Sequence, residues 1–154
     1  MKETLPSVTD PHQPIEATMP KNRDVGIGII GSGFIVNDCH LPAYNKAGFK
    51  TLGLASRNQE KALQVAKRHK IPYTYPTVEA LLDDERIQVL DIAVPPNAQL
   101  EMIRKAVTKK HLQGILAQKP LGMNLDEACE AVSLCEQAGI ALAVNQNMRY
   151  DPSV

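Results

Sequence analysis

A pair of glycines marks the part of the sequence whose residue types could do chemistry. Gly31, Ser32 and Gly33 follow an apolar run at 25–30 and precede an amphipathic stretch that opens at Phe34. A turn between a strand and a helix start offers an anion unpaired backbone N–H groups and the positive end of the helix dipole. Gly31 permits a tight turn, and Gly33 lets the backbone approach a pyrophosphate closely. This order predicts a dinucleotide-binding turn, with an ordinary strand–turn–helix as the alternative.

The start of the following helix departs from the dinucleotide-binding fingerprint at one position. Val36 replaces its third glycine, so we expect the helix to sit slightly further from the first strand. Phe34 and Ile35, which open this helix, are predicted to belong to the cofactor site together with the glycine turn.

The end of the second predicted strand indicates which dinucleotide would bind. An NAD-type site uses an acidic residue there to accept from the ribose 2′-hydroxyl, but no Asp or Glu lies between Thr51 and Gln59. Ser56 and Arg57 stand there instead, and a hydroxyl with a planar guanidinium suits a 2′-phosphate. We therefore predict NADP in preference to NAD. The alternative is that Arg57 is a solvated loop residue or stacks on the adenine.

Alternating apolar and helical segments must position these residues. We expect an α/β fold, a doubly wound Rossmann domain with a parallel sheet whose ligands lie beyond the carboxyl ends of the strands. The predicted strands cover 25–30, 50–56, 73–75, 89–94, 114–118 and 140–144. The predicted helices cover 34–46 with a break near Pro42, the segments capped by Asn58 and Thr77, the segment opened by Pro95 and Pro96, and 125–138, which Asn124 caps and Gly139 ends.

Length and composition indicate one globular domain. The 154 residues are 44% hydrophobic and carry 17 basic and 17 acidic residues that are interspersed along the chain, so neither nucleic acid nor a membrane is an expected partner. No apolar run approaches the roughly 20 residues of a transmembrane helix, and the first residues lack a secretory signal, so the cytoplasm is the expected compartment. Residues 1–22 hold four prolines among polar residues and read as a disordered or extended leader.

The cysteines and histidines predict no metal site. Three cysteines form no disulfide framework, and Cys129 and Cys135 fall on a predicted apolar helix stripe with Leu125, Ala128 and Val132, so we expect both to be buried. Cys39 and His40 are adjacent but lack further ligands at a convincing spacing. His12 lies in the leader, while His40, His69 and His111 are expected on helix surfaces.

Polar motifs follow the last three predicted strands, and with them the chain resembles a known family. The strands end in Val94-Pro95-Pro96-Asn97, in Gln118-Lys119-Pro120, and in the segment NQNMRYDP at 145–152. Together with GSGFIVNDCHLPAY and LLDDERIQVLDIAVPPN, these motifs resemble the glucose-fructose oxidoreductase and inositol dehydrogenase family (Gfo/Idh/MocA) over about residues 24–154. In that family a Glu-Lys-Pro motif follows strand five, and an Asn-x-Arg-Phe/Tyr-x-Pro segment follows strand six.

The resemblance implies an NAD(P)-dependent oxidoreductase that acts on a sugar, a polyol or a related hydroxylated compound. Lys119 matches the motif lysine, which lies beside nicotinamide and substrate and can stabilise negative charge on the reacting oxygen. It implies that Asn147 contacts the cofactor and Arg149 the substrate. The cofactor-binding residues expected at the other strand ends are Val94, Pro95, Pro96, Asn97, Gln118 and Lys119.

Three departures from the family pattern bear on function. Gln118 replaces the motif glutamate, which excludes an acid role there, and Gln99 stands where many members have histidine. The family also continues into a second, mostly antiparallel domain with an Asp-x-x-x-His acid/base pair. We therefore interpret 23–145 as the cofactor half of a two-domain enzyme, inactive alone, and 146–154 as the start of the crossover. The alternatives are a stand-alone module that senses NAD(P) and a structural domain with a vestigial site.

The remaining expectation concerns assembly. Apolar surface around Met148 and Tyr150 should favour self-association, so we expect a homo-oligomer whose small-molecule partner is carbohydrate-like.

Overall fold

Six parallel strands form one sheet in the computed structural model, which describes residues 19–150 and only the backbone of residues 149 and 150. The strand order is β3-β2-β1-β4-β5-β6, so the chain first winds outward from β1 and then returns to its other side. This reversal confirms the predicted doubly wound Rossmann fold. The strands are β1 (Gly26–Ile30), β2 (Lys50–Ala55), β3 (Tyr73–Tyr75), β4 (Val89–Ile92), β5 (Gly114–Gln118) and β6 (Ala141–Asn145).

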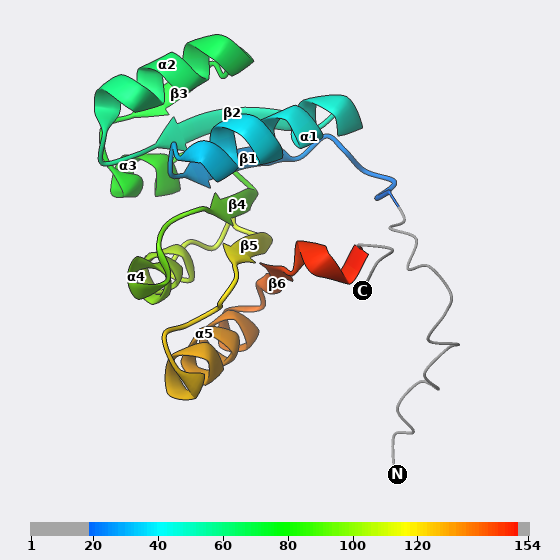
Figure 1. Cartoon of the computed structure of the whole chain (residues 1–154). Helices are drawn as coiled ribbons and strands as arrows, with labels where there is room; N and C mark the ends of the chain where they lie inside the picture. Colours follow the sequence, from blue (N-terminus) through cyan, green and yellow to red (C-terminus); the bar gives the residue numbers. More distant parts are fainter. Residues whose placement is uncertain (1–18, 151–154) are drawn as a thin grey trace.

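Helices cover both faces of the sheet (Figure 1). On one face lie the π-helical segment η1 (Ile35–His40), α1 (Leu41–Ala47) and α2 (Gln59–His69), and on the other α3 (Val78–Leu82), α4 (Pro96–Ala106) and α5 (Leu125–Ala138). A short 3-10 helix, η2 (Asn147–Tyr150), follows β6. Successive residues of a strand face opposite sides, so Ile29 packs against the first set of helices and Ile30 against the second. Each side of β1 thus contributes to a separate apolar core.

The helix starts follow the capping residues seen in the sequence. The side chains of Asn58, Thr77 and Asn124 each accept a hydrogen bond from the backbone N–H three residues later, at 2.9, 3.1 and 2.9 Å. Gly139 ends α5 with a φ of 69°, in the left-handed region that glycine adopts without strain. The three caps and this helix end are confirmed.

The predicted break at Pro42 is wrong, because the helix continues through it. Residues 35–40 widen into a π-helix, and the Leu41 N–H donates to the Val36 carbonyl five residues earlier. Pro42 then occupies the first turn of α1, where a missing N–H costs little.

The predicted buried stripe of α5 is also partly wrong. Cys135 is buried as expected, but Cys129 is exposed, and Leu125 and Val132 are 76% and 40% exposed. The buried face instead includes Ala131. Because α5 packs beside β6, which is the last strand of the sheet, the described structure offers no further element to cover the Cys129 side.

The structure describes part of the predicted leader and allows a search for membrane-spanning helices. Residues 1–18 of the predicted leader and residues 151–154 lie outside the described residues, while residues 19–22 are exposed and form neither helix nor strand. Within residues 19–150, no helix combines the length and apolar character that crossing a membrane requires.

Candidate functional site

A cavity of about 500 Å³ opens at the carboxyl ends of β1, β2 and β4, where the strand order reverses. Seven of the residues predicted for the cofactor site line it: Gly31, Ser32, Gly33, Ser56, Arg57, Val94 and Pro95. The sequence reasoning missed nine further lining residues: Ile30, Lys61, Val78, Glu79, Ala93, Ala98, Glu101, Met102 and Lys105. Ligands bind at this kind of crevice in open α/β sheets.

The lack of a side chain has a different consequence at each glycine of the turn. Gly31 has a φ of 125°, and a Cβ there would lie 2.3 Å from the Ala93 carbonyl oxygen, so the fold itself requires glycine. A Cβ on Gly33 would meet no atom within 4 Å. The backbone at Gly33 is therefore open to a ligand, and the cradle fits a pyrophosphate that must come close to main-chain N–H groups.

The loop after β2 brings polar and cationic groups to the same cavity. Ser56 Oγ lies 2.8 Å from Ser32 Oγ, and Arg57 follows it with an exposed guanidinium. Lys61, in the first turn of α2, adds a second cation. Neither Arg57 nor Lys61 forms an ion pair within residues 19–150. The sequence held a signal for Lys61, because this residue lies three positions after the Asn58 cap. It therefore falls in the first turn of the helix that follows Ser56 and Arg57.

The opposite wall of the cavity combines apolar side chains with a cluster of one lysine and two glutamates, which together carry a net charge of −1. Lys105 Nζ bridges the carboxylates of Glu79 and Glu101 at 2.9 and 2.8 Å. Its hydrogen bond lowers the pKa of Glu79, and the bonds to Glu101 and Glu79 raise the pKa of Lys105. Val78 and Met102 complete this wall. Such a surface suits a flat ring better than a phosphate.

The remaining predicted residues around the turns lie outside this cavity. Phe34 and Ile35 are 68% and 45% exposed at the start of the helix. Pro96 and Asn97 form the first turn of α4, where the sequence placed a helix start. None of these four residues lines the cavity in the described structure.

Gln99 holds the loop that carries Lys119. Its side chain is fully buried, and its Nε2 lies 3.0, 3.1 and 2.8 Å from the carbonyl oxygens of Gln118, Pro120 and Leu121. Its Oε1 accepts from the Gln118 N–H at 2.7 Å. The sequence left any contact by Gln99 open. In the structure it fixes the backbone on both sides of Lys119, whose side chain is exposed.

His40 corrects a second expectation, because it is buried rather than on a helix surface. The last residue of η1, it is 8% exposed and its Nδ1 lies 2.7 Å from Oδ2 of Asp91, which is fully buried in β4. The Tyr44 hydroxyl donates to the same oxygen at 2.8 Å. Burial, followed by the charge of Asp91, raises the pKa of Tyr44. His69 and His111 are half-buried, and His111 lies in a turn after α4.

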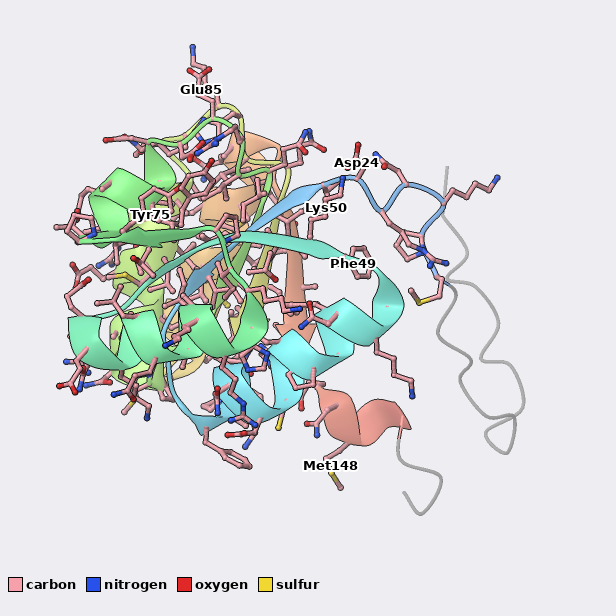
Figure 2. The ribbon with its side chains drawn as sticks, turned by 90° about the horizontal axis from the view of Figure 1, so that it is seen from above. Asp24, Phe49, Lys50, Tyr75, Glu85 and Met148 are labelled. Atoms are coloured by element: carbon pink, nitrogen blue, oxygen red, sulfur yellow. The ribbon has the colours of Figure 1, made fainter. Side chains whose placement is uncertain are left out.

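The residues after β6 are described only in part. Asn147 is exposed in η2, and Met148 projects away from the sheet with 54% exposure (Figure 2). The side chain of Arg149, predicted to contact substrate, lies outside the described residues, as does that of Tyr150. Across the described part of the chain, no group of three or more His, Cys, Asp or Glu side chains could hold a metal ion.

Comparison with known proteins agrees with this geometry. A sequence profile described as "Oxidoreductase family, NAD-binding Rossmann fold" (GFO_IDH_MocA) matches residues 25–146. The chain is 31% identical to an uncharacterized protein of Saccharomyces cerevisiae over 84% of its length, and 30% identical to D-xylose 1-dehydrogenase (NADP(+)) 2 of Haloferax volcanii over 81%. It spans 38% of the length of each of these relatives.

A solved structure gives the same result for the fold. An oxidoreductase from Agrobacterium radiobacter, in complex with NAD+, L-tartaric acid and magnesium, superposes with a TM-score of 0.76 at 25% identity. The match covers 82% of this chain and 36% of that one.

Proposed function

Because the chain belongs to the oxidoreductase family with an NAD-binding Rossmann fold, we propose that it is the cofactor half of an enzyme that transfers hydride between a nicotinamide cofactor and a sugar, polyol or related compound. The observation that carries this proposal is the cavity at the strand reversal, which joins an open glycine turn to Arg57 and Lys61, two cations without an ion pair among residues 19–150. The cofactor supplies the hydride chemistry when bound, and the protein binds and orients it.

The residues of this chain divide between the pyrophosphate of the cofactor and the phosphate on its adenosine ribose. Gly31, Ser32 and Gly33 would hold the pyrophosphate, with Phe34 and Ile35 beside it, while Ser56 and Arg57 would hold the 2′-phosphate. Lys61 joins this set because it lines the same cavity. The residues at the end of β4 and start of α4, from Val94 to Asn97, would pack against the cofactor where β4 meets the crevice.

We propose NADP as the preferred cofactor. Arg57 and Lys61 supply positive charge where an NAD site uses a carboxylate, and Arg is suited to multidentate phosphate contacts. One relative is named as an NADP(+) enzyme, whereas one structural neighbour was solved with NAD+. The cofactor preference therefore rests on the residues of this chain.

The substrate end would be built around Lys119. Its ammonium can donate a hydrogen bond to the reacting oxygen and stabilise negative charge there, while Gln118 and Asn147 contact the cofactor and Arg149 the substrate. Proton transfer also needs a positioned acid or base, which contributes about 10²–10⁴-fold. None of the four histidines lies in an Asp-x-x-x-His motif of the kind that the family resemblance implies, so the 154-residue chain should bind cofactor without turnover.

The partner at this end would be a carbohydrate-like small molecule, in keeping with the xylose dehydrogenase among the relatives. We further propose a cytoplasmic homo-oligomer. Exposure of Met148 beside the substrate end supports self-association through that surface.

Two measurements on the purified chain test the proposal. Calorimetric titration with NADPH and NADH should give saturable binding, and an assay at 340 nm with aldoses, inositols and their oxidised forms should give no steady turnover. If neither cofactor binds, the proposal that this chain is the cofactor half of an oxidoreductase is rejected. Steady turnover would instead mean that this chain already contains a complete active site.

A further inference from the structure

A row of polar side chains, buried at Asp91 and His40 and half-buried at Asn145 and Gln118, leads from the centre of the sheet to the residue before Lys119. It begins at Asp91 in β4 and passes to His40, whose Nδ1 lies 2.7 Å from the carboxylate. His40 Nε2 lies 3.0 Å from Asn145 Nδ2 at the end of β6. The same Asn145 nitrogen lies 3.3 Å from Gln118 Oε1 at the end of β5.

The donors and acceptors in this row have one consistent direction. The Asp91 carboxylate accepts from His40 Nδ1–H, and the Asn145 amide nitrogen can only donate, so His40 Nε2 is the acceptor of that second bond. One N–H of the Asn145 amide donates to that nitrogen and the other to Gln118 Oε1. The titratable groups that contact His40 within the described chain are Asp91 of β4 and Tyr44 of α1, and β5 and β6 contribute neutral amides.

This direction decides which end of the Gln118 amide is available. Its Oε1 is held by Asn145, while its Nε2 is buried and has no hydrogen-bond partner within the described residues. Buried polar groups almost always have partners, and an unpaired one costs about 1–3 kcal/mol. An unpaired amide donor beside Lys119 therefore points to an acceptor oxygen on a ligand.

We propose that His40 is a positioning residue for the cofactor. With Asp91 behind it, His40 fixes the Asn145 amide, and Asn145 in turn presents Gln118 Nε2 as a donor to the carbonyl oxygen of the nicotinamide carboxamide. This inference rests on the proposed function, because it needs the nicotinamide to lie at the ends of β5 and β6.

The experiment measures how much affinity the nicotinamide half adds. The dissociation constants of NADPH and 2′-phospho-ADP-ribose, and of NADH and ADP-ribose as a second pair, are measured by calorimetry. The ratio within each pair is the nicotinamide gain. Gln118→Leu should reduce this gain by about threefold to tenfold, the equivalent of one neutral hydrogen bond, and should leave binding of the ribose phosphates unchanged.

Two conservative variants separate positioning from a structural role. His40→Gln keeps an amide near the position of Nε2, and His40→Asn keeps a donor near Nδ1 for Asp91 but loses the acceptor for Asn145. The proposal expects the gain to be retained in His40→Gln and reduced in His40→Asn. The reverse order, or an unchanged gain in both, would overturn it.

Further controls cover three other results: loss of the gain in both His40 variants, variants that do not fold, and failure of the proposed function. If both variants lose the gain, the double variant of His40→Asn with Gln118→Leu decides: no additional loss supports the proposal, and an additional loss overturns it. If the variants do not fold, ¹⁵N NMR of the wild-type ring decides, because the proposal requires a hydrogen on Nδ1 and none on Nε2. Failure of the proposed function is distinguishable, since the wild type would then bind neither the dinucleotides nor the ribose phosphates.

Discussion

Ser32 Oγ lies 2.8 Å from Ser56 Oγ, so a hydrogen bond ties the glycine turn after β1 to the loop after β2. The two residues are 24 positions apart in sequence, and Ser32 is only 5% exposed. This bond fixes the glycine turn relative to the loop that carries Arg57. In the proposed function, it therefore ties the residues that would hold the pyrophosphate to those that would hold the 2′-phosphate.

Removing either cation from this wall should weaken NADPH binding selectively. A hydrogen bond to a charged group contributes about 1.5–3 kcal/mol, so Arg57→Ala and Lys61→Ala should each weaken NADPH binding by about 10- to 150-fold. NADH affinity should change little, because NADH lacks the 2′-phosphate. Fluorescence titration of both cofactors measures the difference.

Lys67→Ala is the matched control for Lys61→Ala. Both lysines are exposed on α2, but Lys67 lies in its last turn and does not line the cavity. The control should bind both cofactors like the wild type. Equal NADPH affinity in Arg57→Ala, Lys61→Ala and the wild type would rule out the phosphate role.

The two glycines should respond differently to added side chains. Gly33→Val should abolish dinucleotide binding with little change in thermal stability, because a Cβ there meets open space that the pyrophosphate needs. Gly31→Ala should instead destabilise the fold, since its φ is positive and its Cβ would clash with the Ala93 carbonyl. Calorimetry and thermal melting of both variants distinguish these effects. A folded Gly33→Val protein with wild-type affinity would place the cofactor elsewhere.

Local signals explain why most of the fold could be predicted from the sequence. The caps at Asn58 and Asn124 and the end at Gly139 act within one helical turn, so their effects do not depend on the rest of the structure. The glycine turn after β1 is likewise a local feature, and because its residues line the cavity, it also predicted where the cavity lies. The position of β1 followed from an apolar run that is buried on both faces.

The incorrect predictions concern residues whose burial depends on parts of the chain that are distant in sequence. His40 is buried because Asp91, 51 residues away, and Asn145, 105 residues away, surround its ring. No local pattern reveals such partners. Similarly, Cys129 is exposed because of where α5 lies on the sheet edge, which depends on tertiary packing rather than on helical periodicity.

The Gln99 side chain should contribute strongly to stability. Gln99→Leu leaves the Gln118 N–H and three carbonyl oxygens without this partner, and unsatisfied buried groups cost about 1–3 kcal/mol each at most sites. We expect the free energy of unfolding in urea to fall by at least about 2 kcal/mol. Gln137→Leu, an exposed glutamine on α5, should change it by less than about 0.5 kcal/mol. A similar small effect in both variants would contradict the bracing role of Gln99.

Asp84 should produce a defined acid dependence of stability. Hydrogen bonds from Arg86, at 2.8 and 2.5 Å, hold the pKa of the Asp84 carboxyl well below its usual range, and the Tyr75 hydroxyl also donates to it. A depressed pKa stabilises the fold above the unfolded pKa of about 3.9, and this stabilisation is lost as the pH falls through the lower folded value.

Asp84→Asn should therefore lower the free energy of unfolding at pH 7 by about 1 kcal/mol, a modest value because Arg86 is half exposed. The difference between wild type and variant should shrink as the pH drops below about 3.9. Urea unfolding at several pH values measures it. A difference that stays constant down to pH 2 would contradict the ion-pair explanation.

The central claim is that a nicotinamide dinucleotide binds at the carboxyl ends of the strands, and backbone amide NMR shifts test it most directly. Titration with NADPH should shift the amides of Gly31 to Gly33, Ser56, Arg57 and Val94 most strongly. The amides near the amino ends of the strands, such as those of Lys50 and Lys70, should move little. No shifts at saturating NADPH, or the largest shifts at the amino ends of the strands, would contradict the account.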